Sequence, residues 1–484
     1  MFGCIILVLR EREFHTMENE KSQAGLKKSL ALIFVYTVAT GSIFTYVSYW
    51  DSVFFNYCGP GTFLAFALMS LAILPVALVY SELSSLFHTA GGELIYNTVA
   101  LNKHAGFFAS WLIMAAWISV PPAVVMAIAT FISRTFGLAL DFQKIMLIAI
   151  VILLIVFFMS LQDIQFLVKA QAFCLFANIT TTLLTGVLLL CSGHWHLSNL
   201  SPLFQTNLES ISGIPGWVIG MALLITPFFG FETVPQMVEE GDFPISNTKK
   251  AICGSVLTCG AIYTFFFFCV AGLDSFQTLL AGGQDGFMTI NAMKNLLGWQ
   301  IWPLIYGLVS ILLGMTASIL GFWMSIVRML YAMGQKNFLP SIVTKLNKHQ
   351  QPIVPNVFLL LLTLTFVLMQ NATTFMNDFF NLMSFGCACA YALTMISAIV
   401  MRSKHAKWYA NSHSTVVGGN ALRILAMVIM VAIAYFCTLG QGRGSWISFG
   451  VYMSVGVLIW LWMVLVKWRH SRVVIETPDG KQEF

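Results

Sequence analysis

Charge is what this 484-residue sequence lacks, because only 9% of its residues are Asp, Glu, Lys or Arg. Soluble domains carry about 25% charged residues. Hydrophobic residues make up 58% of the chain, which excludes an ordinary soluble domain and indicates an all-α polytopic membrane protein embedded in a lipid bilayer. The net charge of +5 follows membrane topology and gives no indication of nucleic-acid binding.

Metal-type spacing and catalytic constellations are also missing. The ten cysteines lie mostly inside apolar runs, and Cys387 and Cys389 stand too close together for a zinc site. His194 and His196 have no further metal ligand nearby in the sequence. No paired His, Asp and Cys set occurs at one membrane depth. The sequence therefore predicts no metal, no cofactor and no enzyme activity.

Apolar runs long enough to cross about 30 Å of hydrocarbon predict twelve transmembrane helices. The predicted spans lie near 30–57, 62–86, 105–133, 145–161, 168–192, 216–238, 250–273, 301–333, 353–370, 376–401, 422–439 and 446–467. The eighth run is long enough to be tilted or to protrude. The loops 193–215 and 274–300 have room for short interfacial helices.

Lysine and arginine predict the orientation of the chain. With a cytoplasmic N-terminus, all but four of the 25 basic residues fall on the cytoplasmic side. The exceptions are Arg134, Lys144, Lys294 and Arg443. Both termini of this cell-membrane protein are therefore expected in the cytoplasm. Met17 is a more natural start than Met1, because residues 1–8 form neither a span nor a convincing signal peptide.

Two predicted spans are interrupted at mid-depth. Span six contains Pro227 and the run Phe229-Gly230-Phe231-Glu232, and span one contains Thr40-Gly41-Ser42-Ile43. An unwound turn is tolerated in a membrane only where protein or a water-filled cavity surrounds it. Interrupted spans at corresponding positions of two halves are typical of a transporter site built on inverted repeats. The two interrupted spans are five spans apart, which predicts one repeat of five spans at 30–192 and a second at 216–401.

The ends of such half-helices predict the kind of ligand. Free N–H groups suit a carboxylate and free carbonyls suit an ammonium group, so an amino acid zwitterion satisfies both. We expect substrate to contact Thr40, Gly41, Ser42 and Ile43, with N–H groups donating to its carboxylate. We expect Phe229, Gly230, Phe231 and Glu232 to supply carbonyls and an aromatic lid. Helix packing by small residues and a lipid-facing aromatic surface are the structural alternatives.

Glu232 has three interpretations. It is a protonatable coupling group, a partner for a substrate cation, or a structural carboxylate that caps the second half-helix or bonds to span ten. Further coupling or gating candidates are Asp51 at the outer end of span one and Glu82 near the cytoplasmic end of span two. Arg328 or Lys249 is the expected partner of Glu82. Secondary candidates by depth are Ser318 and Trp323 in span eight, and Trp111, Trp117 and Pro121-Pro122 in span three.

Three stretches resemble signatures of the amino acid–polyamine–organocation permeases. The first is Leu74–Leu83 with Ala90-Gly91-Gly92-Glu93-Leu94-Ile95-Tyr96; the second is Gly230-Phe231-Glu232 with Glu239-Glu240; the third is Arg328–Pro340. They occur in the family's order over about residues 30–400. The resemblance implies the five-plus-five inverted-repeat fold of leucine-type transporters and secondary transport of amino acids or related amines, as proton symport or exchange, by alternating access.

The sequence departs from this family pattern in places. Thr40 and Ser42 stand where glycines are usual, which crowds the backbone and adds two hydroxyl donors. Asn178 falls about where some members carry a lysine proposed to bind the coupling proton, which puts that route in doubt. The alternative function is a nutrient sensor or channel-like protein on the same scaffold. The identity of the substrate, the coupling ion and the oligomeric state stay open.

The expected organisation is a tail, two repeats and an appended pair of helices. In chain order it comprises an N-terminal cytoplasmic tail at 1–29, repeat one at 30–192, an outer loop at 193–215, repeat two at 216–401, a cytoplasmic loop at 402–421, spans eleven and twelve at 422–467, and a C-terminal tail at 468–484.

Overall fold

The computed structural model describes residues 28–44, 47, 49–87, 89–138, 140–283, 286–370, 375–410, 416 and 418–484. Within them, ten helical segments are long and apolar enough to cross a membrane, and Leu32–Ile43 and Ile353–Met369 are shorter apolar helices. The class of polytopic helical membrane protein is therefore confirmed, whereas the count of twelve spans stays a prediction. The choice between Met1 and Met17 lies outside the described residues.

Helices α2 to α10 cover the first half of the described chain. Their bounds are α2 (Leu32–Ile43), α3 (Asp51–Cys58), α4 (Thr62–Leu86), α5 (Gly92–Ala100), α6 (Lys103–Thr135), α7 (Phe142–Ser160), α8 (Ile164–Leu190), α9 (Gly216–Leu223) and α10 (Val234–Met237). Short 3₁₀ turns η3 (Thr226–Phe228), η4 (Phe231–Thr233) and η5 (Val238–Glu240) lie beside α10.

The second half continues with long helices and ends in a hairpin. The bounds are α11 (Thr248–Ala271), α12 (Phe276–Gly282), α13 (Met288–Asn295), α14 (Ile301–Gly307), α15 (Met315–Gln335), α16 (Ile353–Met369), α17 (Phe375–Lys404), α18 (Ala406–Ala410), α19 (Asn420–Thr438), α20 (Arg443–Trp462), α21 (Trp468–His470), β1 (Val474–Thr477) and β2 (Gly480–Glu483). The two strands pair antiparallel.

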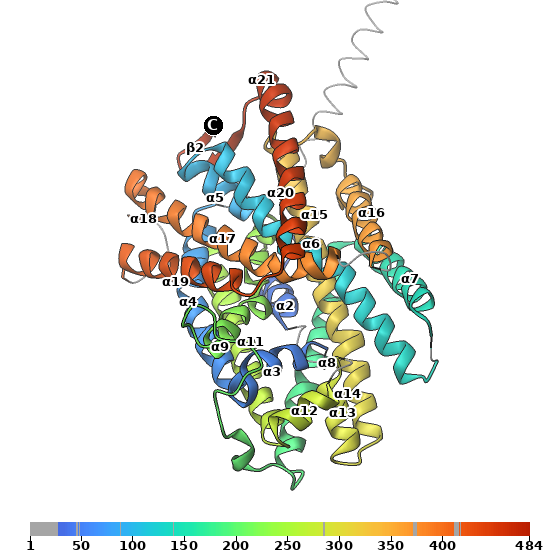
Figure 1. The fold of residues 1–484 in the computed structure, drawn as a ribbon. Coiled ribbons are helices and arrows are strands. Elements are labelled where there is room, and N and C mark those ends of the chain that lie inside the picture. The colour runs from blue at the N-terminus through green and yellow to red at the C-terminus, as the bar shows by residue number, and fades with distance from the viewer. Residues whose placement is uncertain are drawn as a thin grey trace, which may run out of the picture.

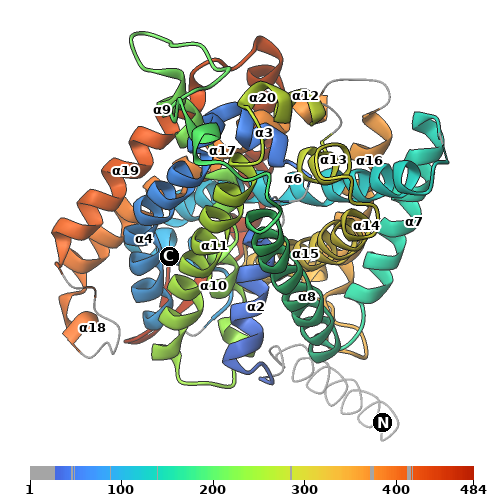
Figure 2. The same ribbon diagram turned by 90° about the horizontal axis from the view of Figure 1, so that it is seen from below.

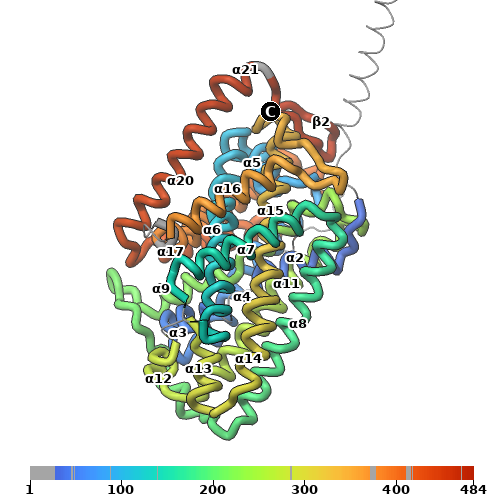
Figure 3. The backbone as a smooth tube through the Cα atoms, turned by 90° about the vertical axis from the view of Figure 1, so that its right-hand side faces the viewer, coloured from blue at the N-terminus to red at the C-terminus, as the bar shows by residue number. Residues whose placement is uncertain are grey.

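Helix α2 lies at the centre of the bundle, packed against α8, α11 and α15 (Figure 2). Helices α7 and α16 lie on one flank, and α18 and α19 lie on the opposite flank (Figure 1). Helix α5, α21 and the hairpin gather at one end of the molecule, whereas α12 and α13 lie at the other end (Figures 1 and 3). The central position of α2 buries its interrupted end inside protein.

Local chemistry explains why span six is broken. Pro227 lies in η3 and Pro235 is the second residue of the short helix α10, and neither residue offers a backbone N–H. Gly230, between them, has φ of +134°, a conformation that only glycine adopts without strain. The prolines and the glycine therefore leave α9 and α10 as two short helices joined by 3₁₀ turns.

The long eighth run forms a helix with a wide turn. Leu308–Gly314 is a π-helical stretch between α14 and α15, and such stretches often occur at functional positions. The loop at 274–300 contains the short helices α12 and α13, whereas the loop at 193–215 contains a 3₁₀ turn at Leu197–Leu200. Their interfacial position stays a prediction.

Candidate functional site

The breaks of spans one and six meet at the centre of the bundle. A Cβ atom at Gly230 would lie 2.7 Å from Ser42 Cβ and 2.9 Å from Ile43 N. The end of α2 therefore packs directly on the turn between η3 and η4. The two interrupted segments that the sequence paired are in contact in the structure.

The end of α2 presents carbonyl groups at the break. Gly41–Ile43 forms the last turn of α2, so their N–H groups lie within the helix, where each bonds to the carbonyl four residues earlier. This differs from the predicted role of these N–H groups as carboxylate donors, because unwinding begins one residue later, at Phe44. The Tyr263 hydroxyl donates to Ile43 O at 2.5 Å, and Asn178 Nδ2 donates to Phe44 O at 3.2 Å.

The hydroxyls of the first break are directed into their own helix. Thr40 Oγ1 donates to Tyr36 O at 2.7 Å and Ser42 Oγ donates to Val38 O at 2.9 Å. Such back-bonding is common for Ser and Thr in helices. The two extra donors that the sequence predicted are therefore already engaged in this conformation.

Glu232 is the buried carboxylate of the site, with no exposed surface. Oε1 accepts from Trp117 Nε1 at 2.8 Å, and Oε2 accepts from the Tyr391 hydroxyl at 2.7 Å and from Gly230 N at 2.8 Å. These donors come from α6, from α17 and from the break itself, and they replace the water that a buried carboxylate loses. The predicted hydrogen bond between Glu232 and span ten is confirmed by Tyr391.

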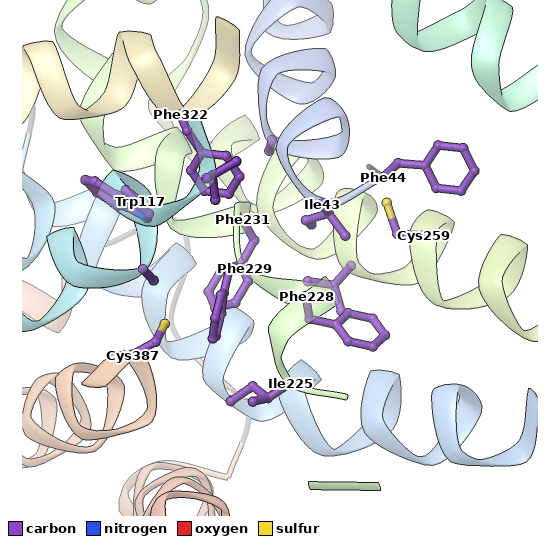
Figure 4. Packing of buried hydrophobic residues seen from close by; sticks show 14 of the residues in the cluster. Ile43, Phe44, Trp117, Ile225, Phe228, Phe229, Phe231, Cys259, Phe322 and Cys387 are labelled. Carbon is purple, nitrogen blue, oxygen red and sulfur yellow. The ribbon is translucent and has the colours of Figure 1, made fainter. Parts of the chain in front are cut away.

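Aromatic rings surround the break of span six (Figure 4). The ring of Phe231 lies 5.3 Å from that of Tyr391 and 5.4 Å from that of Tyr80, and Phe229 lies 6.5 Å from Tyr391. Phe229 and Phe231 are fully buried, which excludes the lipid-facing alternative for them. Buried aromatic rings therefore form much of the surroundings of Glu232.

A cavity of about 230 Å³ lies beside the break, where α3, η3 and α17 meet. Its lining is Trp50, Val53, Phe54, Tyr57, Leu223, Thr226, Phe380, Asn381, Ser384 and Gln441. The rings of Trp50 and Phe380 stack at 6.1 Å. Both rings also line a second cavity of about 170 Å³, so the stack forms a wall shared by the two cavities.

The opposite side of the break, toward α5, is closed by a buried ion pair. Arg328 Nη2 donates to Glu240 Oε1 at 2.9 Å, and Arg328 is 1% exposed. Beside it, Ala90 N donates to Glu239 Oε2 at 3.2 Å. The structure thus combines a cavity on the α3 side with an ion-paired closure on the α5 side.

Two acidic candidates join neighbouring helices. Asp51, the coupling or gating candidate at the outer end of span one, is fully buried and accepts from Ser52 N at 2.7 Å and Thr289 N at 2.8 Å. It therefore joins α3 to α13. Glu82 pairs with Arg423 of α19, not with Arg328 or Lys249. This buried pair fixes α19 against α4 and does not bridge the closure on the α5 side.

The remaining candidates divide between the site and the scaffold. Ser318 Oγ lies 3.5 Å from Ser42 O, at the edge of hydrogen-bond range beside the break. Trp323 Nε1 donates to Asn356 Oδ1 at 2.8 Å and joins α15 to α16. Trp111 Nε1 donates to Tyr452 O at 3.2 Å on α20. Ser318 and Trp117 therefore belong near the break, whereas Trp323 and Trp111 join neighbouring helices.

Sequence reasoning missed Tyr391 and Tyr263, which bond to Glu232 and to the end of α2. Both are tyrosines inside long apolar runs. A buried tyrosine hydroxyl usually finds a polar partner, so a tyrosine within a span was the available signal. That signal gives no partner, since Tyr391 lies 159 positions from Glu232 and Tyr263 lies 220 positions from Ile43.

The chain is similar in sequence to known permeases and transporters over most of its length. Residues 25–466 match a family model described as amino acid permease. The methylthioribose transporter of Bacillus subtilis strain 168 is 22% identical over 436 residues, which cover 85% of this chain and 87% of the relative. The branched-chain amino acid permease BcaP of the same strain is 22% identical over 437 residues, covering 86% and 87%. Its glutamate/serine transporter AimA is 24% identical over 307 residues, covering 60% and 56%.

Proposed function

Because this chain belongs to the amino acid permease family, whose members are transporters and not enzymes, we propose that it carries a neutral, largely apolar amino acid across the cell membrane together with a proton. The substrate lies at the meeting point of the two breaks, against Thr40–Ile43 and Phe229–Glu232. The observation that carries the proposal is the contact of Gly230 with Ser42 and Ile43 beside the buried Glu232.

The surroundings of the break support a neutral substrate. Glu232 already accepts three hydrogen bonds, so it has little capacity left for a substrate cation. Phe229, Phe231 and Ile43 are buried apolar side chains at the same place. Binding pockets of this kind recognise apolar groups by burial and use a few polar groups for orientation. The relative BcaP is named for branched-chain amino acids, which is consistent with this class.

The hydrogen bonds of Glu232 link its protonation to the break. The Trp117 indole and the Gly230 amide can only donate, whereas the Tyr391 hydroxyl can donate or accept. A protonated Glu232 needs an acceptor, so Tyr391 reverses its hydrogen bond and the contact with Trp117 or Gly230 weakens. Proton binding therefore acts directly on the backbone of span six at Gly230.

Alternating access uses the closure on either side of the break. The expected topology has repeats at 30–192 and 216–401, appended spans at 422–467, and both termini in the cytoplasm. With this topology, the Arg328–Glu240 pair lies at the cytoplasmic side. The Trp50–Phe380 stack then lies at the outer side. Spans one, two, six and seven rock against three, four, eight and nine, so each closure opens in turn while the central site stays in place.

Counterflow in proteoliposomes tests this function. Vesicles loaded with one unlabelled amino acid are diluted into trace radiolabelled leucine, serine, glutamate, lysine or methylthioribose. Uptake is then repeated with an alkaline interior as the only driving force. We expect saturable leucine counterflow, little lysine counterflow, and faster leucine accumulation with the pH gradient. Glu232→Gln is expected to keep counterflow and lose the acceleration by the gradient.

Each outcome decides a part of the proposal. Absence of counterflow for every compound overturns transport by this chain and favours a sensor. Preferred lysine counterflow overturns the neutral substrate class. Leucine counterflow that is indifferent to the pH gradient overturns proton symport and favours exchange. As a matched control, Glu209→Gln removes a carboxylate from the exposed loop after α8 and leaves all three properties unchanged.

A further inference from the structure

A second carboxylate, Glu93, lies buried on helix α5, on the α5 side of the break in span six. Glu93 has no exposed surface, and neither does its neighbour Gln236 on α10. Gln236 Nε2 donates to Glu93 Oε2 at 3.1 Å. In the part of the chain that the structure describes, Glu93 Oε1 and Gln236 Oε1 are both buried without a hydrogen-bond partner. Buried polar atoms without partners are costly, so this arrangement needs an explanation.

A proton on Glu93 supplies that explanation. A neutral carboxyl pairs with a primary amide through two hydrogen bonds: the amide N–H donates to one carboxyl oxygen, and the carboxyl O–H donates to the amide oxygen. The first bond is present. The second requires Glu93 Oε1 and Gln236 Oε1, and both of these atoms are among the buried polar atoms of the described residues that lack a partner, as is the Tyr80 hydroxyl. One proton would therefore satisfy both.

Close packing of Gly92 against the side chains of Pro235 and Gln236 keeps Glu93 and Gln236 adjacent. A Cβ atom at Gly92 would lie 2.9 Å from Pro235 Cβ and 3.0 Å from Gln236 Nε2. No side chain fits between the start of α5 and α10, so Glu93 and Gln236 stay adjacent while α5 remains seated on α10. Movement of the second half of span six away from α5 separates the pair.

The electrostatic surroundings of Glu93, as far as the described residues extend, contain no counter-charge. The titratable groups facing it are Tyr80 on α4, Tyr96 on α5, Glu232 on η4 and Cys387 on α17. Both arginines buried in the described chain are already paired, Arg328 with Glu240 and Arg423 with Glu82. Helix α5 lies outside the candidate membrane spans. Burial, with a smaller contribution from the charge of Glu232, raises the pKa of Glu93 to about 8.

Tyr80 connects the two buried carboxylates. Its hydroxyl lies beside Glu93, and its ring packs on Phe231 at 5.4 Å and on Tyr391 at 5.6 Å. Tyr391 in turn donates to Glu232. A tyrosine hydroxyl can accept one proton while it donates its own, so Tyr391 and Tyr80 together are suited to pass a proton between Glu232 and Glu93.

We propose that Glu93 is a second proton-binding carboxyl of the transport cycle, which receives the proton of Glu232 and releases it on the α5 side of the membrane. The inference rests on the proposed proton symport. The Glu232 carboxyl gives its proton to the Tyr391 hydroxyl that it faces, Tyr391 passes its own proton to Tyr80, and the Tyr80 hydroxyl proton moves to Glu93 Oε1. Glu232 thereby becomes ionised and Glu93 becomes neutral. When α10 moves away from α5, Glu93 loses Gln236 as an acceptor and gives its proton to water.

The test combines transport with a direct measurement of the proton. In vesicles of one orientation, the pH on each side is varied separately while leucine counterflow is measured. Glu93→Gln is expected to keep counterflow, lose its dependence on the pH of the α5 side, and reduce gradient-driven accumulation at least tenfold. Glu93→Asp, which keeps a titratable carboxyl, is expected to retain a dependence with a shifted midpoint. Infrared difference spectra across pH should lose one protonated-carboxyl band in Glu93→Gln.

The outcomes separate this inference from the proposed function. If wild-type protein shows no counterflow, the proposed function fails, and the infrared titration alone decides whether Glu93 binds a proton. If wild-type transport responds to pH and Glu93→Gln responds identically, the inference fails while proton symport stands. An unchanged carboxyl band in Glu93→Gln also overturns it. Glu239→Gln, which removes a half-buried carboxylate at the same junction, serves as the matched control and should keep the wild-type pH dependence.

Discussion

Replacing Gly230 by alanine tests the contact between the two breaks. The added methyl group would lie 2.7 Å from Ser42 Cβ, 2.9 Å from Ile43 N and 3.0 Å from Ile43 Cγ1. Two of these three neighbours cannot rotate away, because one is a backbone nitrogen and the other is a Cβ atom. Alanine must also adopt the φ of +134° that Gly230 has. The substitution therefore forces the end of α2 away from the turn between η3 and η4.

Two terms set the size of the expected effect. Backbone strain at such a φ costs about 1–3 kcal/mol, and overpacking of a close contact costs about 1–3 kcal/mol. Together they predict that Gly230→Ala is less stable than wild type by about 2–6 kcal/mol. Because the strained contact lies at the proposed substrate site, leucine binding is expected to weaken as well as the fold.

A matched variant separates the two terms. Gly137, in the loop after α6, has φ of +61°, and a Cβ atom added to it would meet nothing within 4 Å in the described chain. Gly137→Ala carries only the milder backbone cost of the left-handed helical region, about 1–2 kcal/mol, without overpacking, and is expected to melt less far below wild type than Gly230→Ala. Melting temperatures in detergent, measured with and without leucine, compare the two variants. Equal melting temperatures and equal shifts by leucine would refute the claim that the two breaks are in tight contact.

Three further substitutions have expected outcomes. Trp117→Phe removes one of the three donors to Glu232 and should lower the free energy of unfolding by about 1–3 kcal/mol. The pH profile of gradient-driven uptake should shift toward higher pH, because the ionised carboxylate loses a donor. An unchanged profile would contradict the assigned hydrogen bond. Arg328→Met leaves Glu240 buried without a counter-charge and should cost about 3–5 kcal/mol by thermal melting, with partial recovery when Glu240→Gln is added. Trp50→Ala removes the ring that stacks on α17, so bound leucine should dissociate faster in a filter-binding chase; equal rates would show that this ring is not a barrier to exit.

The sequence predicted the membrane class and the location of the breaks because both depend on local chemistry. Long apolar runs with few charges cross membranes wherever they occur. Prolines and a glycine of positive φ interrupt a helix regardless of its neighbours. Glu232 was identifiable for the same reason, since an acidic residue inside an apolar run needs a polar surrounding.

Glu93 was not identifiable in this way. It lies two residues after Gly91 in a segment between two spans, where a carboxylate is ordinarily solvated. The packing of α5 against α6 and α17 and the contact with Gln236 of α10 bury it. Asp51 shows the same limit, because its position at the outer end of span one did not reveal that Thr289 of α13 donates to it.

The partners of the charged and hydrogen-bonding groups were decided by the tertiary structure. Glu232 bonds to Trp117 and Tyr391, which lie 115 and 159 positions away, and Glu82 pairs with Arg423, which lies 341 positions away. The sequence by itself determined that buried carboxylates would need partners, because an unpaired charge in an apolar interior is costly. Which donor each carboxylate received depended on how helices distant in the chain pack together, and no local pattern contains that information.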